Sequence, residues 1–270
     1  MNYKFISDAH IHSDNSYDAL DPTIKLCEHA TNVGLYSITI TDHCNCNEYN
    51  IKDSRRAVRQ SFFLAKKAQS VYKESINVFA GIELGEPTHN KFAANDALLQ
   101  SDFDFVLAGI HKLKNSENFS KIKFTNDNVN DIIDKYFLEI IDLINWGNFD
   151  SLAHLLYPFK FILKYPELKI DTDSISEKIN IITKDLAQNN KALEIDNFMA
   201  SELSDDTLSL SSILISFKNS GGKYITFGSN AHSCENIGSG IEKGLNTALY
   251  VGFTHFSLFK NRVPYLIPIN

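Results

Sequence analysis

The sequence has no excess of positive charge. It contains 26 Lys and Arg residues against 33 Asp and Glu, a formal net charge of −7 at pH 7. Proteins that hold a nucleic-acid backbone usually do so with clustered Lys and Arg, so this balance disfavours nucleic acid as a partner, although bound divalent metals would add positive charge that the count omits. A nuclease is further disfavoured because no basic strip is interleaved with aromatic residues.

Long apolar runs and paired cysteines are also missing. The segment from Met1 to Asp8 lacks the apolar run of a signal peptide, and no stretch of about eighteen apolar residues follows. The four cysteines, Cys27, Cys44, Cys46 and Cys234, show no paired CxxC spacing of a zinc ribbon, and a chain of this size needs no disulfides. We therefore expect free thiols in a cytoplasmic protein that has no membrane partner.

The residues that are present are those of a packed protein, with 43% hydrophobic and 22% charged residues. Short β-rich runs alternate with longer stretches of helical period. The predicted strands are Lys4–Ala9, Tyr36–Thr41, Asn77–Glu83, Phe103–Ile110, Asp150–His154, Ala192–Asp196 and Lys223–Gly228. The predicted helices are Pro22–Val33, Ser54–Lys73, Asn95–Leu99, Asp127–Trp146, Asp173–Gln188, Asp205–Ser220 and Gly240–Val251.

This alternation predicts an α/β protein with a parallel sheet and helices outside it. Seven strand–helix units can close into a TIM-like β/α barrel, and an open doubly wound sheet is the alternative. Since no linker, repeat or low-complexity tract interrupts the pattern, we expect a single domain over residues 1–270.

Histidines and carboxylates gather at the C-terminal ends of the predicted strands. Of the nine histidines, six lie there: His10, His12, His43, His111, His154 and His232. The carboxylates at the same ends are Asp8, Asp18, Asp42, Glu83, Glu86, Glu194 and Asp196. Because loops at the C-terminal face of a β/α barrel converge on one site, these side chains are predicted to share a small volume.

Mixed imidazole and carboxylate donors are typical of Zn, Fe or Mn, and there are too many donors for a single ion. Each signal alone is weak, because a histidine at a strand end is more often a hydrogen-bonded structural residue. The placement of six histidines and several carboxylates at the same end of the strands favours a metal site over separate structural roles. Glu83 follows a buried apolar strand, where an unpaired carboxylate is costly without a cation. For Glu194, an internal ion pair is as good an interpretation as direct ligation.

The ordered set of motifs resembles the PHP (polymerase and histidinol phosphatase) superfamily, and especially its histidinol-phosphate phosphatase branch. The matching segments are residues 8–12 (DAHIH) with Ser16 and Asp18, 41–43 (TDH), 81–85 (GIELG), 108–111 (AGIH), 152–154 (LAH), 192–195 (ALEI) and 228–232 (GSNAH). The C-terminal segment from Phe256 to Pro268 also resembles the end of that branch. Together these motifs span nearly the whole chain.

The resemblance implies a distorted seven-stranded β/α barrel that holds three divalent metals (Zn, Mn or Fe) and hydrolyses a small phosphate monoester, L-histidinol phosphate, in histidine biosynthesis. It implies a first metal on His10, His12, Glu83 and Asn230, a second on Glu83, His111 and His154, and a third on Asp18, His43 and His232. The residues expected at the centre of the chemistry are Glu83, His43, Asn230 and His232. Candidates to orient the ligand histidines are Asp8, Asp42, Glu194 and Asp196.

The sequence departs from the family pattern in two places. Asn230 stands where the family has Asp, which keeps a carbonyl oxygen but loses the negative charge. The arginines expected to grip phosphate are not evident; Lys160 and Lys112 are candidate point charges, without the bidentate fork of arginine. Tyr157 and Phe198 are candidate walls of a substrate pocket. The alternatives are therefore a phosphatase for another small phosphomonoester or nucleotide, or a low-activity protein that binds metal and phosphate.

Overall fold

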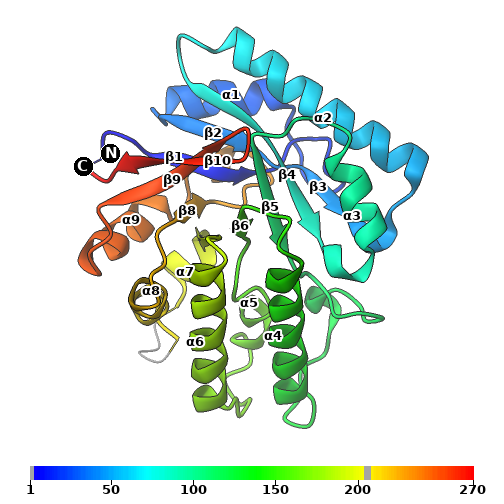
Figure 1. Cartoon of the computed structure of the whole chain (residues 1–270), viewed down its shortest axis with the longest axis vertical. Coiled ribbons are helices and arrows are strands. Elements are labelled where there is room, and N and C mark those ends of the chain that lie inside the picture. The colour runs from blue at the N-terminus through cyan, green and yellow to red at the C-terminus, as the bar shows by residue number, and fades with distance from the viewer. Residues whose placement is uncertain (1–2, 204–207) are drawn as a thin grey trace.

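Parallel strands form the centre of the computed structural model, which describes residues 3–203 and 208–270 (Figure 1). The strands are β1 (Ser7–Ile11), β2 (Ser37–Ile40), β3 (His43–Asn45), β4 (Asn77–Gly85), β5 (Phe105–Gly109), β6 (Ser151–Leu152), β7 (Ala192–Asp196) and β8 (Ile225–Gly228). They pair in the order β1-β2-β4-β5-β6-β7-β8, with β3 on β4. A parallel bridge between Ile11 and Ala231 joins the two ends, so the sheet is nearly closed and the predicted barrel is confirmed.

Helices follow most of the strands and pack outside the barrel. They are α1 (Thr23–Asn32), α2 (Ile51–Val71), α3 (Lys91–Leu98), α4 (Val129–Trp146), α5 (Phe159–Ile162), α6 (Thr172–Gln188), α7 (Asn197–Ser201), α8 (Leu210–Asn219) and α9 (Ile241–Tyr250). Figure 1 shows α4 and α6 running side by side, and the two helices are in contact. Within the described residues, none of these helices combines the length and the apolar character that crossing a membrane requires.

The predicted strands all occur, and the structure adds a short strand, β3, and the two strands of a C-terminal hairpin that the sequence did not predict. The second predicted strand ends at Ile40, and after two residues the chain forms β3, whose His43 pairs in register with Glu83 of β4. The long strand β4 therefore pairs with β2 along its first half and with β3 along its second. This arrangement places His43 in the sheet beside Glu83, whereas the sequence placed it just past the end of the predicted strand Tyr36–Thr41.

Two helices begin earlier than the sequence pattern predicts, because an asparagine caps the first turn of each. The Asn50 side chain accepts hydrogen bonds from the backbone N–H groups of Lys52 and Asp53, so α2 begins at Ile51. Asn90 likewise accepts from Ala93 and starts α3. Such caps satisfy the unpaired N–H groups of a first turn. The predicted helix over 205–220 is observed from Leu210, and its predicted start falls among residues 204–207, outside the described residues.

A C-terminal hairpin closes the N-terminal end of the barrel. Its strands, β9 (His255–Lys260) and β10 (Val263–Pro268), are antiparallel. Phe259 packs inside the barrel against Ala9, Phe105, Leu107, Ala153 and Ala192. At the tip of the hairpin, the backbone N–H of Arg262 donates to the Asp104 carbonyl, and its guanidinium bonds both carboxylate oxygens of Asp150. Aspartates at the starts of β5 and β6 thus anchor the hairpin.

Replacing Phe259, which packs inside the barrel, tests this account of the hairpin. Phe259→Ala removes a side chain that is 6% exposed, and we expect the free energy of unfolding to fall by about 3–5 kcal/mol. Leu266→Ala, on the same hairpin but 51% exposed, is the matched control and is expected to change stability by less than about 1 kcal/mol. Chemical denaturation of both variants measures this, and equal losses would contradict the proposed packing.

Candidate metal centre

The two oxygens of the Glu83 carboxylate are surrounded by imidazole nitrogens at the C-terminal mouth of the barrel. Oε2 lies 3.4 Å from His10 Nε2, 3.5 Å from His12 Nε2 and 2.7 Å from His43 Nδ1. Oε1 lies 2.8 Å from His154 Nε2 and 3.3 Å from His111 Nε2. The carboxylate is completely buried. Five histidines expected at strand ends are therefore brought to one carboxylate.

Several of these atoms lie close together without forming hydrogen bonds. His10 Nε2, His43 Nδ1 and Glu83 Oε2 are buried and have no hydrogen-bond partner among the described residues. His43 Nδ1 lies 2.7 Å from Glu83 Oε2 but does not make a hydrogen bond with it. Buried polar atoms normally find a partner, so unpaired donors and acceptors converging in this way fit a cation that the side chains would share.

Three overlapping groups of side chains have ligand atoms close enough to hold an ion. They are His12 with His43 and His232, His10 with His12 and Glu83, and His43 with Glu83 and His111, each with atoms within 4.8 Å of one another. Asp18 lies at the edge of the first group, with its oxygens 3.7 Å from His43 Nε2 and 3.3 Å from His232 Nε2. The overlap at Glu83, His43 and His12 suits a centre that holds more than one ion.

Asn230 belongs to the same cluster through its position after β8. Its Oδ1 lies 3.1 Å from His12 Nε2, and its backbone carbonyl lies 3.0 Å from His232 Nδ1. The pairing of β1 with the segment after β8 produces this contact, because the backbone N–H of His12 donates to the Ala231 carbonyl. The side-chain oxygen is thus placed as a ligand would be, without a carboxylate's charge.

The electrostatics of the cluster favour an ionised Glu83 and divide the imidazoles into neutral and protonated ones. Burial alone would raise the pKa of Glu83, but His43, His10 and His111 outweigh it and lower that pKa well below its usual value. Burial, His43 and His10 lower the pKa of His12, and burial also lowers the pKa of His154. Burial also opposes the charge of His10 and His111, but Glu194 and Glu83 raise the pKa of His10 to about 10, and Glu83 and Glu86 raise the pKa of His111 well above its usual value. Because metals bind neutral imidazole, His10 and His111 must lose a proton when an ion binds, so metal binding depends on pH.

Four predicted supporting carboxylates take different places around the ligands. Glu194 contacts the cluster directly, 2.8 Å from His10 Nδ1, and accepts from the backbone N–H of His154. Asp42 accepts from Ser16 Oγ, which in turn lies 3.3 Å from His12 Nδ1.

The other two carboxylates shape the backbone. Asp8 accepts from the N–H groups of Ser229 and Gly238, which fixes the loop after β8. Asp196 accepts from Met199 N–H and begins α7. Burial, followed by the neighbouring Glu194, raises the pKa of Asp196 to about 7.

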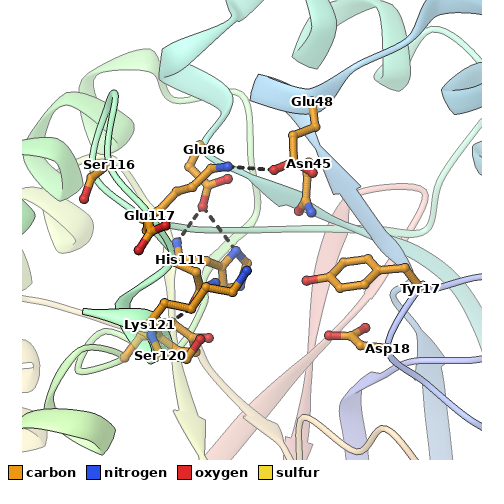
Figure 2. Close-up of a pocket in the computed structure, with 13 residues that line it drawn as sticks. Tyr17, Asp18, Asn45, Glu48, Glu86, His111, Ser116, Glu117, Ser120 and Lys121 are labelled. Atoms are coloured by element: carbon orange, nitrogen blue, oxygen red, sulfur yellow. Dashed lines mark hydrogen bonds and ion pairs between the residues drawn. The ribbon is translucent and has the colours of Figure 1, made fainter. Parts of the chain in front are cut away.

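A cavity of about 600 Å³ opens beside His111 (Figure 2). Tyr17 and Asp18 lie on one side of it in Figure 2, and Glu86 and His111 on the other. Of the predicted substrate residues, Tyr157 and Lys112 line this cavity. Lys112 Nζ is already engaged, 2.7 Å from Glu48 Oε1.

The other two predicted substrate residues lie away from the cavity. Phe198 is buried in the hydrophobic core, 6% exposed, and is not among the residues that line the cavity. Lys160 is exposed on α5 and does not line it either. From the sequence, an aromatic residue after a strand predicts a pocket wall. That prediction is right for Tyr157, which lines the cavity, and wrong for Phe198, which lies in the core.

Glu86 is a site residue to which the sequence alone assigned no role. Its Oε1 accepts from the backbone N–H of His111 at 2.6 Å and lies 3.3 Å from His111 Nδ1. Its place directly after β4, next to Gly85, was the available signal, but the contact depends on a backbone conformation that sequence patterns do not reveal.

Known proteins resemble this chain along most of its length. A model of the PHP domain matches residues 8–197, more than half of the chain. The histidinol-phosphatase of Lactococcus lactis is 27% identical over 254 residues, 93% of each chain, and a probable histidinol-phosphatase of Thermotoga maritima is 25% identical over 260 residues, 93% of this chain and 94% of that one.

Solved structures share the architecture as well. The crystal structure of the L. lactis histidinol phosphate phosphatase, complexed with zinc, L-histidinol and phosphate, superposes with a TM-score of 0.79 at 26% identity, covering 96% of this chain and 98% of that one. A putative histidinol phosphatase of Listeria monocytogenes, at 13% identity and a TM-score of 0.65, covers 86% and 97% and shares the fold.

A glycine next to the cluster allows a test of its geometry. A Cβ on Gly228 would lie 2.3 Å from Glu194 Oε1 and 2.5 Å from the Cβ of His10, so Gly228→Ala must displace His10. We expect divalent metal to bind about 10- to 100-fold more weakly, the usual cost of disturbing a ligand's support. Titration of the metal-free protein measures this.

The matched control is Gly244→Ala. Its Cβ would lie 3.0 Å from Ile195 and Phe227, crowding β7 and β8 from the helix side instead of from the cluster. This variant should lose stability and keep its metal affinity. If both variants bind metal as the wild type does, the contact between Gly228 and His10 does not shape the centre.

Proposed function

The chain belongs to the PHP domain family, and on this basis we propose that it is a metal-dependent phosphatase that hydrolyses L-histidinol phosphate to L-histidinol and phosphate. The observation that carries the proposal is the convergence of five imidazoles on Glu83, in a chain that resembles the L. lactis phosphatase over 93% of its length. The zinc, L-histidinol and phosphate in the structure of that relative support both the metal and the substrate.

We propose that the centre holds three divalent ions, drawn from Zn, Mn and Fe. The ligand sets would be His10, His12, Glu83 and Asn230 for the first ion, Glu83, His111 and His154 for the second, and Asp18, His43 and His232 for the third. When bound, such ions act as Lewis acids toward phosphate oxygens and favour the ionisation of water near neutral pH. Glu83, with both oxygens facing imidazoles, would join the first two sites.

The protein's own residues would orient the substrate and exclude bulk water. The cavity next to His111 is large enough for a small organic phosphate and is bordered by Tyr17 and Tyr157. Glu117 adds negative charge to its wall, which suits a leaving group that carries a protonated amine, whereas Glu48 is paired with Lys112. Since no arginine borders the cavity in the described structure, the phosphate would be held chiefly at the metal centre.

Asn230 favours a second candidate function on the same scaffold, a protein that binds metal and phosphate but turns over slowly. A carboxylate at this position would add a negative charge next to His12, whereas the amide offers a neutral oxygen 3.1 Å from Nε2. A weaker first metal site would reduce turnover without abolishing phosphate binding.

Phosphate release from L-histidinol phosphate, with Mn or Zn added, tests the proposed function. We expect the wild-type chain to be active and Asn230→Asp to raise kcat by about 10- to 100-fold, by analogy with the loss that disturbing a ligand's support causes. Activity found only in Asn230→Asp would favour the second candidate function, a protein that binds metal and phosphate but turns over slowly. If both forms hydrolyse other monoesters but leave histidinol phosphate intact, the substrate assignment is wrong.

Removing the shared ligands should abolish the activity without unfolding the chain. We expect Glu83→Ala and His43→Ala to lose phosphatase activity while the far-UV circular dichroism spectrum stays native, because both side chains serve the cluster at the barrel mouth. His255→Ala, an exposed histidine on β9, is the matched control and should keep wild-type turnover. Near-native activity in either ligand variant would rule out the metal assignment.

A further inference from the structure

Glu86 has an unusual backbone conformation at the mouth of the barrel. It follows the last residue of β4 with φ 49° and ψ 49°, in the left-handed region that residues other than glycine rarely adopt. Its backbone N–H donates to the Gly109 carbonyl at 3.0 Å, which ties this turn to the end of β5. The side chain is 2% exposed and borders the cavity shown in Figure 2.

We propose that Glu86 is a positioning residue that fixes the His111 imidazole for the metal centre, an inference that rests on the proposed metal-dependent function. Glu86 Oε1 accepts from the His111 backbone N–H at 2.6 Å and lies 3.3 Å from Nδ1 of the same residue. The carboxylate thus accepts a hydrogen bond from the main chain of His111 and lies within ion-pair distance of its ring. A proton on Nδ1, facing Glu86, leaves the lone pair on Nε2.

The far side of the ring is where a ligand is needed. His111 Nε2 lies 3.3 Å from Glu83 Oε1 and 3.1 Å from His154 Nε2, the other residues of the proposed second site. The ring also packs closely on the main chain, since a Cβ on Gly85 would lie 3.2 Å from Nδ1. Gly85 and Glu86 therefore determine together which nitrogen of His111 faces the cluster.

The backbone strain at Glu86 matches strain elsewhere in the site. In the described part of the chain, the non-glycine residues with positive φ are Glu86, Asn115, His154, Asn190, Asn230, Asn261 and Arg262. Glu86, His154 and Asn230 lie at the barrel mouth, and four of the seven are asparagines, which tolerate this conformation best. A glutamate and a histidine held this way at one site indicate a conformation maintained for function.

The experiment compares metal binding by wild type, Glu86→Gly and Glu86→Gln, each first stripped of metal. Glycine adopts positive φ freely, so Glu86→Gly removes the side chain without adding backbone strain. We expect its most weakly bound Zn²⁺ to bind about 10- to 100-fold more weakly in calorimetric titration, with kcat lowered and KM for histidinol phosphate little changed. Glu86→Gln keeps an oxygen for both contacts and should recover most of the affinity.

Asn190→Gly is the matched control, because Asn190 has φ 53° in an exposed turn between α6 and β7. It should leave Zn²⁺ affinity, kcat and KM unchanged. The inference is overturned if Glu86→Gly binds Zn²⁺ like the wild type, and a raised KM in that case would mean that Glu86 contacts the substrate instead. A wild-type chain that binds no Zn²⁺ would overturn the proposed function itself, and this inference with it.

Discussion

The carboxylate of Glu83 lies fully buried at the mouth of the barrel, with imidazoles from neighbouring strand ends around both of its oxygens. An ionised group in such a place is costly unless opposite charge or a cation compensates it. The barrel supplies the compensation by its register. His43 pairs with Glu83 across β3 and β4, and the bridge between Ile11 and Ala231 brings β1 to the segment after β8. Closure of the sheet therefore brings the members of the cluster together.

The large side chains at the narrow mouth of the barrel fit only where neighbouring strand residues have no Cβ, and glycines provide this space. A Cβ on Gly109 would lie 2.4 Å from the His154 ring, and one on Gly228 would overlap both Glu194 and His10. Glycine weakens a strand because it packs no side chain. Stability is instead concentrated at the opposite end, where Phe259 fills the barrel and Arg262 bonds Asp150. The two faces of the barrel thus divide stability and chemistry between them.

The sequence predicted the parts of this structure that depend on local pattern. Buried strands with polar residues at their C-terminal ends were evident, so the seven strands and the convergence of six histidines were expected. Helix starts were missed where a single asparagine, Asn50 or Asn90, caps the first turn. The short strand β3 was missed because His43 joins the sheet through pairing with Glu83, a contact 40 residues apart in the chain. Lys112 could be placed near the site, but its pairing with Glu48 depends on tertiary structure.

Glu86 shows why such contacts escape a sequence pattern. Its neighbours, Gly85 and Pro87, indicate a turn, yet nothing in the pattern indicates that a glutamate adopts φ 49° or that its carboxylate reaches His111. That geometry exists because β4 and β5 end at the same level. The Glu86 N–H can therefore reach the Gly109 carbonyl, and the Glu86 side chain can reach His111. Residue type at a strand end therefore predicts which groups meet at the barrel mouth, while the orientation of each imidazole depends on backbone turns that only the closed barrel holds in place.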